Sequence, residues 1–120
     1  MRKLTIVLLA FSVLIYGVTL AAAAGHGLVW PATFFPDLVA LDWRSQFNAD
    51  LLMHLILFGV WACWREGGGV WGYTAGISCV VWGGMFSFPY LIYLGWKAGG
   101  RLDRVLLGVH HAAQARDVGV

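Results

Sequence analysis

The sequence predicts an all-α integral membrane protein with three transmembrane helices, an interfacial aromatic connection and a C-terminal amphipathic helix. Of its 120 residues, 60% are hydrophobic and 12% are charged, against about 25% charged residues in a typical soluble domain. The apolar residues are gathered into blocks that are long enough to cross a bilayer. We therefore predict one multi-pass membrane domain over residues 1–120, placed in a bacterial inner membrane.

The first block begins with the basic pair Arg2-Lys3 and continues as an uncharged run from Leu4 to Ala24. At 1.5 Å per residue this run is long enough to span the hydrocarbon core. A basic head, an apolar body and an alanine-rich tail are also typical of a cleaved signal peptide. We predict a retained first span over residues 4–24.

The connection that follows is rich in aromatic residues and contains two prolines. Its apolar runs are too short to cross a membrane and too hydrophobic for a free loop. They predict a segment at the level of the lipid headgroups, or a docking surface for a partner. The expected interfacial anchors are Trp30, Phe34, Phe35 and Trp43.

The second and third spans are predicted over residues 47–64 and 70–94. The polar turn between them, REGGG at residues 65–69, is so short that the two spans must return antiparallel as a helical hairpin. Within the third span, Pro89 cannot donate a hydrogen bond to the Met85 carbonyl and should kink the last turns.

Beyond the third span, apolar residues recur at helical spacing and polar residues fall on the other side. This pattern predicts an amphipathic helix over residues 101–116, lying on the membrane surface or on a partner. Its apolar stripe consists of Leu102, Val105, Leu106, Val109 and Ala113.

The charged residues do not all favour the same orientation of the chain in the membrane. A basic N-terminus and an acidic first connection favour a cytoplasmic N-terminus, and three spans then place the C-terminus outside. Lys97, Arg101 and Arg104 would lie outside as well, against the positive-inside bias.

Asp50 and His54 form the polar pair most suggestive of chemistry, because they lie one helical turn apart at the head of the second span. An ionisable pair within a span suggests a proton relay, or a histidine that binds a haem or a chlorophyll-type pigment. The structural alternative is that Asn48 or Asp50 caps the helix and that Asp50 or a neighbouring helix satisfies His54. The other histidines (His26, His110 and His111) lie outside the predicted spans, so a second axial ligand would come from a partner chain.

Small residues in the third span predict close helix packing, within the chain or against a partner. They form two small-xxx-small steps, Gly72 with Gly76 and Gly83 with Ser87. Most tryptophans fall at predicted span ends. Trp82 lies deep in the third span and is expected to pack against a partner or a cofactor ring.

Several functional classes find no support in the sequence. It contains no nucleophile–base set, phosphate loop or zinc signature, so we expect no enzymatic activity and no metal site. The eight Lys and Arg residues are scattered rather than clustered, which argues against nucleic acid as a partner. The expected partners are membrane lipid and other membrane-protein subunits.

The pattern FNADLL…FGVWACWREGG…WGY…WGGMFSFPYLIYL, over residues 47–94, resembles that of short bacterial three-span membrane proteins of unknown function. The resemblance implies a three-helix membrane fold and supplies no catalytic residues. From the sequence we expect an accessory or assembly subunit of an energy-transducing membrane complex, respiratory or photosynthetic. The alternatives are a cofactor-binding subunit that uses His54 and a small oligomeric transporter.

Overall fold

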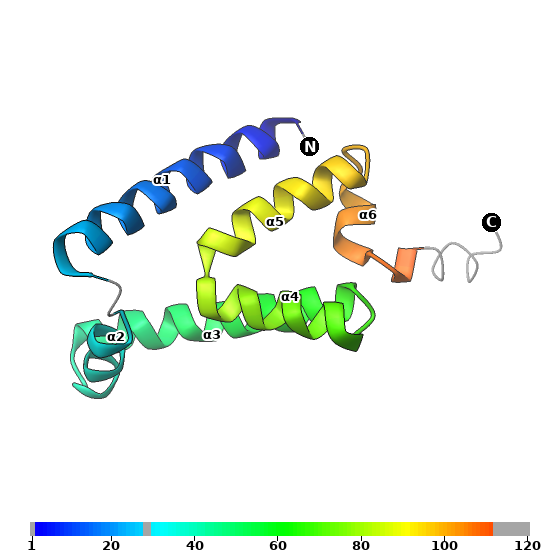
Figure 1. Ribbon diagram of the computed structural model, residues 1–120. Coiled ribbons are helices and arrows are strands. Elements are labelled where there is room, and N and C mark those ends of the chain that lie inside the picture. The colour runs from blue at the N-terminus through cyan, green and yellow to red at the C-terminus, as the bar shows by residue number, and fades with distance from the viewer. Residues whose placement is uncertain (1, 28–29, 112–120) are drawn as a thin grey trace.

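The computed structural model describes residues 2–27 and 30–111, and all regular secondary structure in them is helical, as predicted (Figure 1). The helices are α1 (Arg2–His26), α2 (Trp30–Val39), α3 (Trp43–Arg65), α4 (Gly69–Trp82), α5 (Gly84–Lys97) and α6 (Leu102–Leu107). Among the described residues, two helices are long and apolar enough to cross a membrane, namely α1 with 25 residues and α3 with 23.

Helix α3 begins four residues earlier than the predicted second span, and Asp42 is its N-cap. The Asp42 carboxylate accepts a hydrogen bond from the Ser45 N–H at 3.1 Å, and the Ser45 hydroxyl accepts one from the Asp42 N–H at 3.2 Å. This reciprocal capping box satisfies the exposed amides of the first turn. Neither Asn48 nor Asp50 caps the helix, so the prediction that one of them is the N-cap is wrong.

Helices α3 and α4 form the predicted antiparallel hairpin, and two glycines set their separation. A Cβ atom on Gly59 would lie 2.6 Å from the Gly76 carbonyl oxygen, and one on Gly76 would lie 2.8 Å from the Gly59 oxygen. No real Cβ contact is that short. The two backbones therefore meet at a distance that only glycine allows.

Where the sequence predicts one helix over residues 70–94, the structure has two, separated at Gly83. This residue has φ of 56° and ψ of −133°, a conformation that L side chains rarely adopt. Helix α4 runs back along α3, and α5 then returns toward the end of the molecule at which α4 began (Figure 1). The chain thus reverses where a continuous span was expected.

Pro89 lies inside α5 without ending it. The Met85 carbonyl, which loses its helical donor at Pro89, instead accepts a hydrogen bond of 2.7 Å from the Tyr16 hydroxyl of α1. The rings of Phe11 and Phe88 add a second contact between α1 and α5, with centroids 5.4 Å apart. Helix α1 therefore supports the proline-containing turn.

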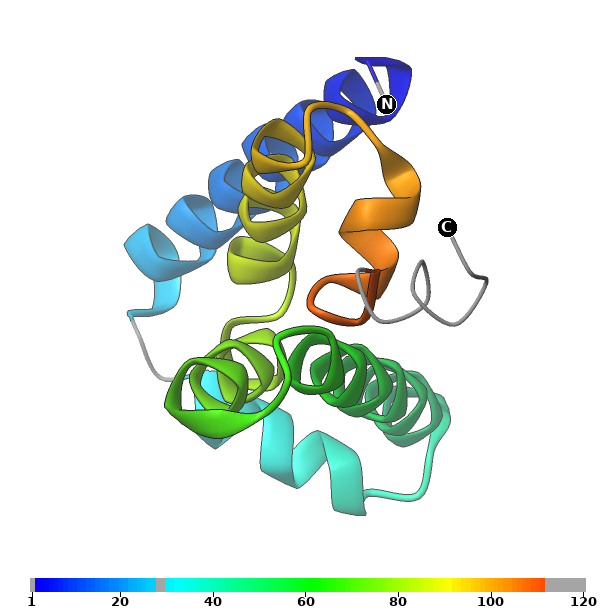
Figure 2. The same cartoon turned by 90° about the vertical axis from the view of Figure 1, so that its right-hand side faces the viewer.

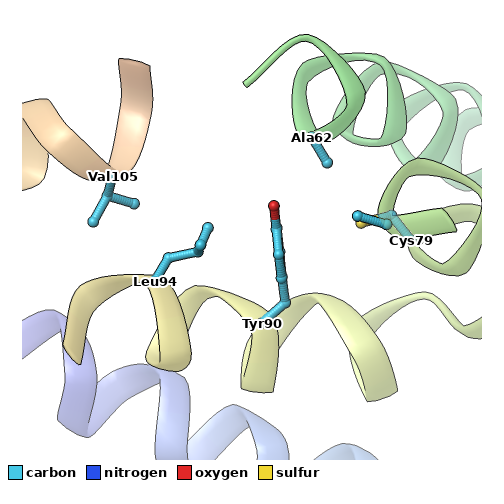
Figure 3. Packing of buried hydrophobic residues seen from close by; sticks show 6 residues of the cluster. Ala62, Cys79, Tyr90, Leu94 and Val105 are labelled. Carbon is cyan, nitrogen blue, oxygen red and sulfur yellow. The ribbon is translucent and has the colours of Figure 1, made fainter. Parts of the chain in front are cut away.

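The helices form two pairs, α1 with α5 and α3 with α4, and α6 lies between the pairs at one end (Figure 2). The buried core joins α3, α4, α5 and α6, and Tyr90 points from α5 into the space between them (Figure 3). It consists of Ala62, Ala75, Cys79, Tyr90, Leu94 and Val105. Helix α2 packs on α3.

Helix α6 is shorter than the amphipathic helix predicted over residues 101–116. It ends at Leu107, with the positive-φ residue Gly108 as its C-cap. Of the predicted apolar stripe, Val105 is buried in the core, whereas Leu102 and Leu106 are exposed. The part of the prediction that falls on residues 112–116 lies outside the described residues.

Because α5 returns, the start of α1, the α3–α4 turn, the end of α5 and α6 all lie at one end of the molecule (Figure 1). We call this the basic end, since these segments carry Arg2, Lys3, Arg65, Lys97, Arg101 and Arg104. The opposite end, which we call the acidic end, consists of α2 and the start of α3 and carries Asp37, Asp42 and Arg44.

Candidate functional site

The predicted Asp50–His54 pair lies on successive turns of α3. The Nδ1 atom of His54 is 2.8 Å from the Asp50 carbonyl oxygen and 3.4 Å from its carboxylate Oδ1. Both side chains are exposed, 71% for His54 and 59% for Asp50. The Nε2 atom of His54 has no hydrogen bond to any described residue, so one ring nitrogen is held by Asp50 and the other is accessible.

The surroundings of this pair do not form a complete metal site. Within residues 2–27 and 30–111, no group of three or more His, Cys, Asp or Glu side chains is placed to hold a metal ion. The described residues therefore supply no such cluster of ligands around His54.

Three segments that are distant in the sequence border an open cavity of about 620 Å³ at the basic end. It lies between the α3–α4 turn, the C-terminal end of α5, and α6. We call it the basic cavity. Its polar and aromatic lining includes Arg65, Glu66, Trp71, Tyr93, Lys97 and Arg104.

Arg65 forms the inner wall of the basic cavity and is only 8% exposed. Its guanidinium donates hydrogen bonds to the backbone carbonyls of Val105 and Arg104 in α6, and it forms an ion pair with Glu66. The same Glu66 oxygen accepts a hydrogen bond of 2.6 Å from the buried Tyr90 hydroxyl. Every charged group of this cluster thus has a partner, as burial requires.

The outer wall of the basic cavity carries the charged side chains of Lys97 and Arg104. The Lys97 ammonium lies 5.9 Å from the centre of the Tyr93 ring, and the Arg104 side chain has no hydrogen bond or ion pair to another described residue. Nearby, Asp103 pairs with His111 and Arg101, each at 2.9 Å. Hydrogen bonds from His111 and Arg101 lower the pKa of Asp103 to about 2.

The basic cavity does not follow from the sequence. The basic residues fall at predicted helix ends, but a continuous third span would place Lys97 and Arg104 on the opposite side of the membrane from Arg65. The signal that could have found the cavity was the Gly83-Gly84 pair, because adjacent glycines can mark a break in a helix.

The predicted small-residue positions lie in contacts within this chain. A Cβ atom on Gly72 would be 3.1 Å from the Cys63 carbonyl oxygen, and Gly76 faces Gly59, so both lie against α3. Gly83 lies at the break, where its Cβ position is 3.7 Å from Leu55, and Ser87 is buried on α5. The chain itself therefore occupies the faces for which a partner was one option.

Trp82 is the last residue of α4 and is exposed beside the break. It lines an apolar hollow of about 460 Å³ together with residues of α1, α2 and α3 such as Thr19, Phe34 and Leu55. This hollow lies on the far side of the Gly83 break from the basic cavity, between the two long helices.

No family model, curated protein or solved structure matches this chain.

Proposed function

We propose that this chain is an integral membrane protein in which α1 and α3 cross the bilayer and α4–α5 form a re-entrant hairpin. Each of α4 and α5 has 14 residues, about 21 Å at 1.5 Å per residue, against a hydrocarbon core of about 30 Å. Gly83 lies beside Leu55, near the middle of α3. A hairpin that enters from the basic end would therefore turn at mid-membrane.

The backbone at the break supports this placement. Non-helical backbone at membrane depth is tolerated where protein satisfies its polar groups. The Gly83 N–H donates to the Cys79 carbonyl at 3.1 Å, and the Met85 carbonyl accepts from Tyr16. The Gly83 N–H and the Met85 carbonyl would therefore not need water as a hydrogen-bond partner.

The charge distribution supports a cytoplasmic basic end. Basic residues concentrate on the cytoplasmic side of inner-membrane proteins. In a re-entrant arrangement the N-terminus, the α3–α4 turn and α6 share that side, whereas the acidic end faces outward. The conflict that three full spans create for Lys97, Arg101 and Arg104 then disappears.

Within the membrane, the proposed role is that of an accessory or assembly subunit of a larger inner-membrane complex. The observation that carries this proposal is the exposed Asp50–His54 pair. Without Asp50 and His54, α3 offers only residues 55–64, about 15 Å, for the hydrocarbon core. Crossing with α3 therefore places the pair below the headgroups, where lipid cannot satisfy it. A polar group of a partner helix would cover it.

The favoured partner is a helix of an energy-transducing complex, respiratory or photosynthetic, and the contribution of this chain is assembly rather than catalysis.

One observation favours a second role, that of a cofactor-binding subunit. Asp50 holds Nδ1 of His54 and leaves Nε2 open, and metal-binding histidines are commonly oriented in this way. A haem or chlorophyll-type pigment would then occupy the same face of α3.

A photo-crosslinking amino acid at position 54 tests the assembly role. The matched control is position 14, because Leu14 is also an exposed position on a long apolar helix, at 65% exposure. We expect a discrete crosslinked protein from position 54 in native membranes and none from position 14. A protein that is correctly inserted but gives only lipid adducts at position 54 would refute the partner.

An absorption spectrum of the gently purified protein separates the second role from the first. A visible band that disappears in His54→Gln would assign a cofactor to this residue, because an amide is a poor substitute for an imidazole on iron or magnesium. A colourless protein that retains its crosslink supports assembly alone.

A further inference from the structure

We propose that the basic cavity binds the phosphate headgroup of an anionic phospholipid. This inference rests on the membrane placement proposed above, and not on the partner of Asp50 and His54. Its starting point is the juxtaposition of Lys97 and Arg104 at the mouth of a cavity of about 620 Å³ whose inner wall is the buried Arg65.

The charges of the cavity leave a positive excess. Glu66 is the carboxylate among the residues that line it, and it is already engaged by Arg65 and by the Tyr90 hydroxyl. Lys97 and Arg104 have no carboxylate partner among the described residues. Two uncompensated cations facing one cavity favour an anion with several acceptor oxygens, which is the chemistry of a phosphate group.

The size and lining of the cavity favour a lipid over a small free anion. A volume of about 620 Å³ lies in the range of pockets that hold organic ligands and far exceeds the needs of inorganic phosphate. Trp71 and Tyr93 line it and are exposed. Such amphipathic rings belong at the headgroup level, where they contact the glycerol and upper acyl region.

The position of the cavity also favours a lipid. The basic end is the end proposed to face the cytoplasm, where anionic lipids attract basic residues. Another face of α6 borders an apolar hollow of about 340 Å³ lined by Leu4, Leu8 and Leu102 among others. Apolar and cationic surfaces thus lie at the same end of the molecule, as a bound phospholipid requires.

The test is native mass spectrometry of the full chain purified in detergent, titrated with phosphatidylglycerol, phosphatidylcholine or inorganic phosphate. We expect retention of phosphatidylglycerol over phosphatidylcholine, with no displacement by millimolar inorganic phosphate. Removal of both free cations in Lys97→Gln/Arg104→Gln should lower the affinity for phosphatidylglycerol by roughly thirtyfold, because each basic group near a surface contributes about fivefold.

The matched control is Arg2→Gln/Lys3→Gln, which removes the same charge from the same end but outside the cavity. This variant should bind phosphatidylglycerol like the wild type, and so should the charge-retaining variant Lys97→Arg. Equal losses in the two neutralised double variants would overturn the site, since bulk surface charge would then explain binding.

Two other results would also overturn the proposal. Equal retention of the two lipids by the wild type would do so without any variant, and displacement by inorganic phosphate would assign the cavity to a soluble anion. A chain that inserts into membranes and crosslinks at position 54 but shows no lipid preference would refute this inference alone. A chain that alkaline carbonate strips from membranes would instead refute the membrane placement.

Discussion

At the scale of single residues, Arg65 contacts more parts of the molecule than the charge pattern of the sequence indicates. It lies at the C-terminal end of α3, donates to two carbonyls of α6 and pairs with Glu66, which in turn accepts from Tyr90 of α5. In the sequence, Arg65 and Glu66 appear only as a polar turn between two spans. Three helices converge there because a buried charge must find partners wherever the fold offers them.

Tyr90→Phe tests this cluster. The substitution keeps the ring in the core and removes the hydrogen bond to Glu66, and a bond to a charged group contributes about 1.5–3 kcal/mol. We expect a loss of unfolding free energy of that size in detergent-based denaturation. Tyr93→Phe is the control, because Tyr93 is exposed and its hydroxyl makes no hydrogen bond to another described residue. Equal stabilities of the two variants would contradict the role of the cluster.

The Asp103–His111 contact predicts a dependence on pH. The pKa of Asp103 is lowered from 3.8 to about 2 in the folded chain, so its stabilising contribution is fully present above about pH 4. It is lost as the pH falls from there to about 2. Amide exchange in α6, corrected for its intrinsic pH dependence, should therefore accelerate across this window in the wild type. In Asp103→Asn the change should be absent, and an identical change in both proteins would argue against the contact.

At the scale of elements, the α4–α5 break is the feature that changes the topology. Apolar composition and a length of 25 residues for the run 70–94 predict one span, and Pro89 is the expected irregularity. The structure instead turns at Gly83 and passes through Pro89 with help from the Tyr16 hydroxyl. A proline removes one donor, which a neighbour can compensate, whereas a positive φ changes the direction of the chain.

Gly83→Ala distinguishes the two topologies by the sign of its effect. At φ of 56° and ψ of −133°, a Cβ atom introduces strain of about 1–3 kcal/mol, and the variant should be destabilised. In a continuous helix the same change would stabilise the protein by up to about 1 kcal/mol. Thermal unfolding in detergent provides the measurement. Gly17→Ala is the control, since Gly17 lies within α1 with no atom within 4 Å of its Cβ position.

At the scale of the whole molecule, the two helix pairs place all the described Lys and Arg residues except Arg44 at one end and the acidic connection at the other (Figure 1). Helices α1 and α3 provide the length to cross a bilayer, with 25 and 23 residues, whereas α4 and α5 have 14 residues each. The basic end contains the basic cavity, and the apolar hollow beside Trp82 lies on the other side of the Gly83 break.

Cysteine labelling tests the proposed topology. In a Cys63→Ala/Cys79→Ala background, new cysteines at Gly68 and Gly100 should react with a membrane-impermeant reagent only from the cytoplasmic side. A cysteine at Leu41 should react only from the periplasmic side, because this position is 91% exposed at the acidic end. Labelling of position 100 from the periplasm would restore three full spans and contradict the re-entrant hairpin.

The sequence by itself determined the helical class, the two long apolar helices and the hairpin between α3 and α4. These depend on composition, run length and a short turn, all of which are local properties. Only the tertiary structure decided the reversal at Gly83, the capping of α3 by Asp42 and the assembly of the basic cavity. Glycine permits a turn without requiring it, so contacts with α1 and α3 had to select the turned conformation. The cavity follows from that choice, because Lys97 and Arg104 reach Arg65 only when α5 returns to the end where α4 began.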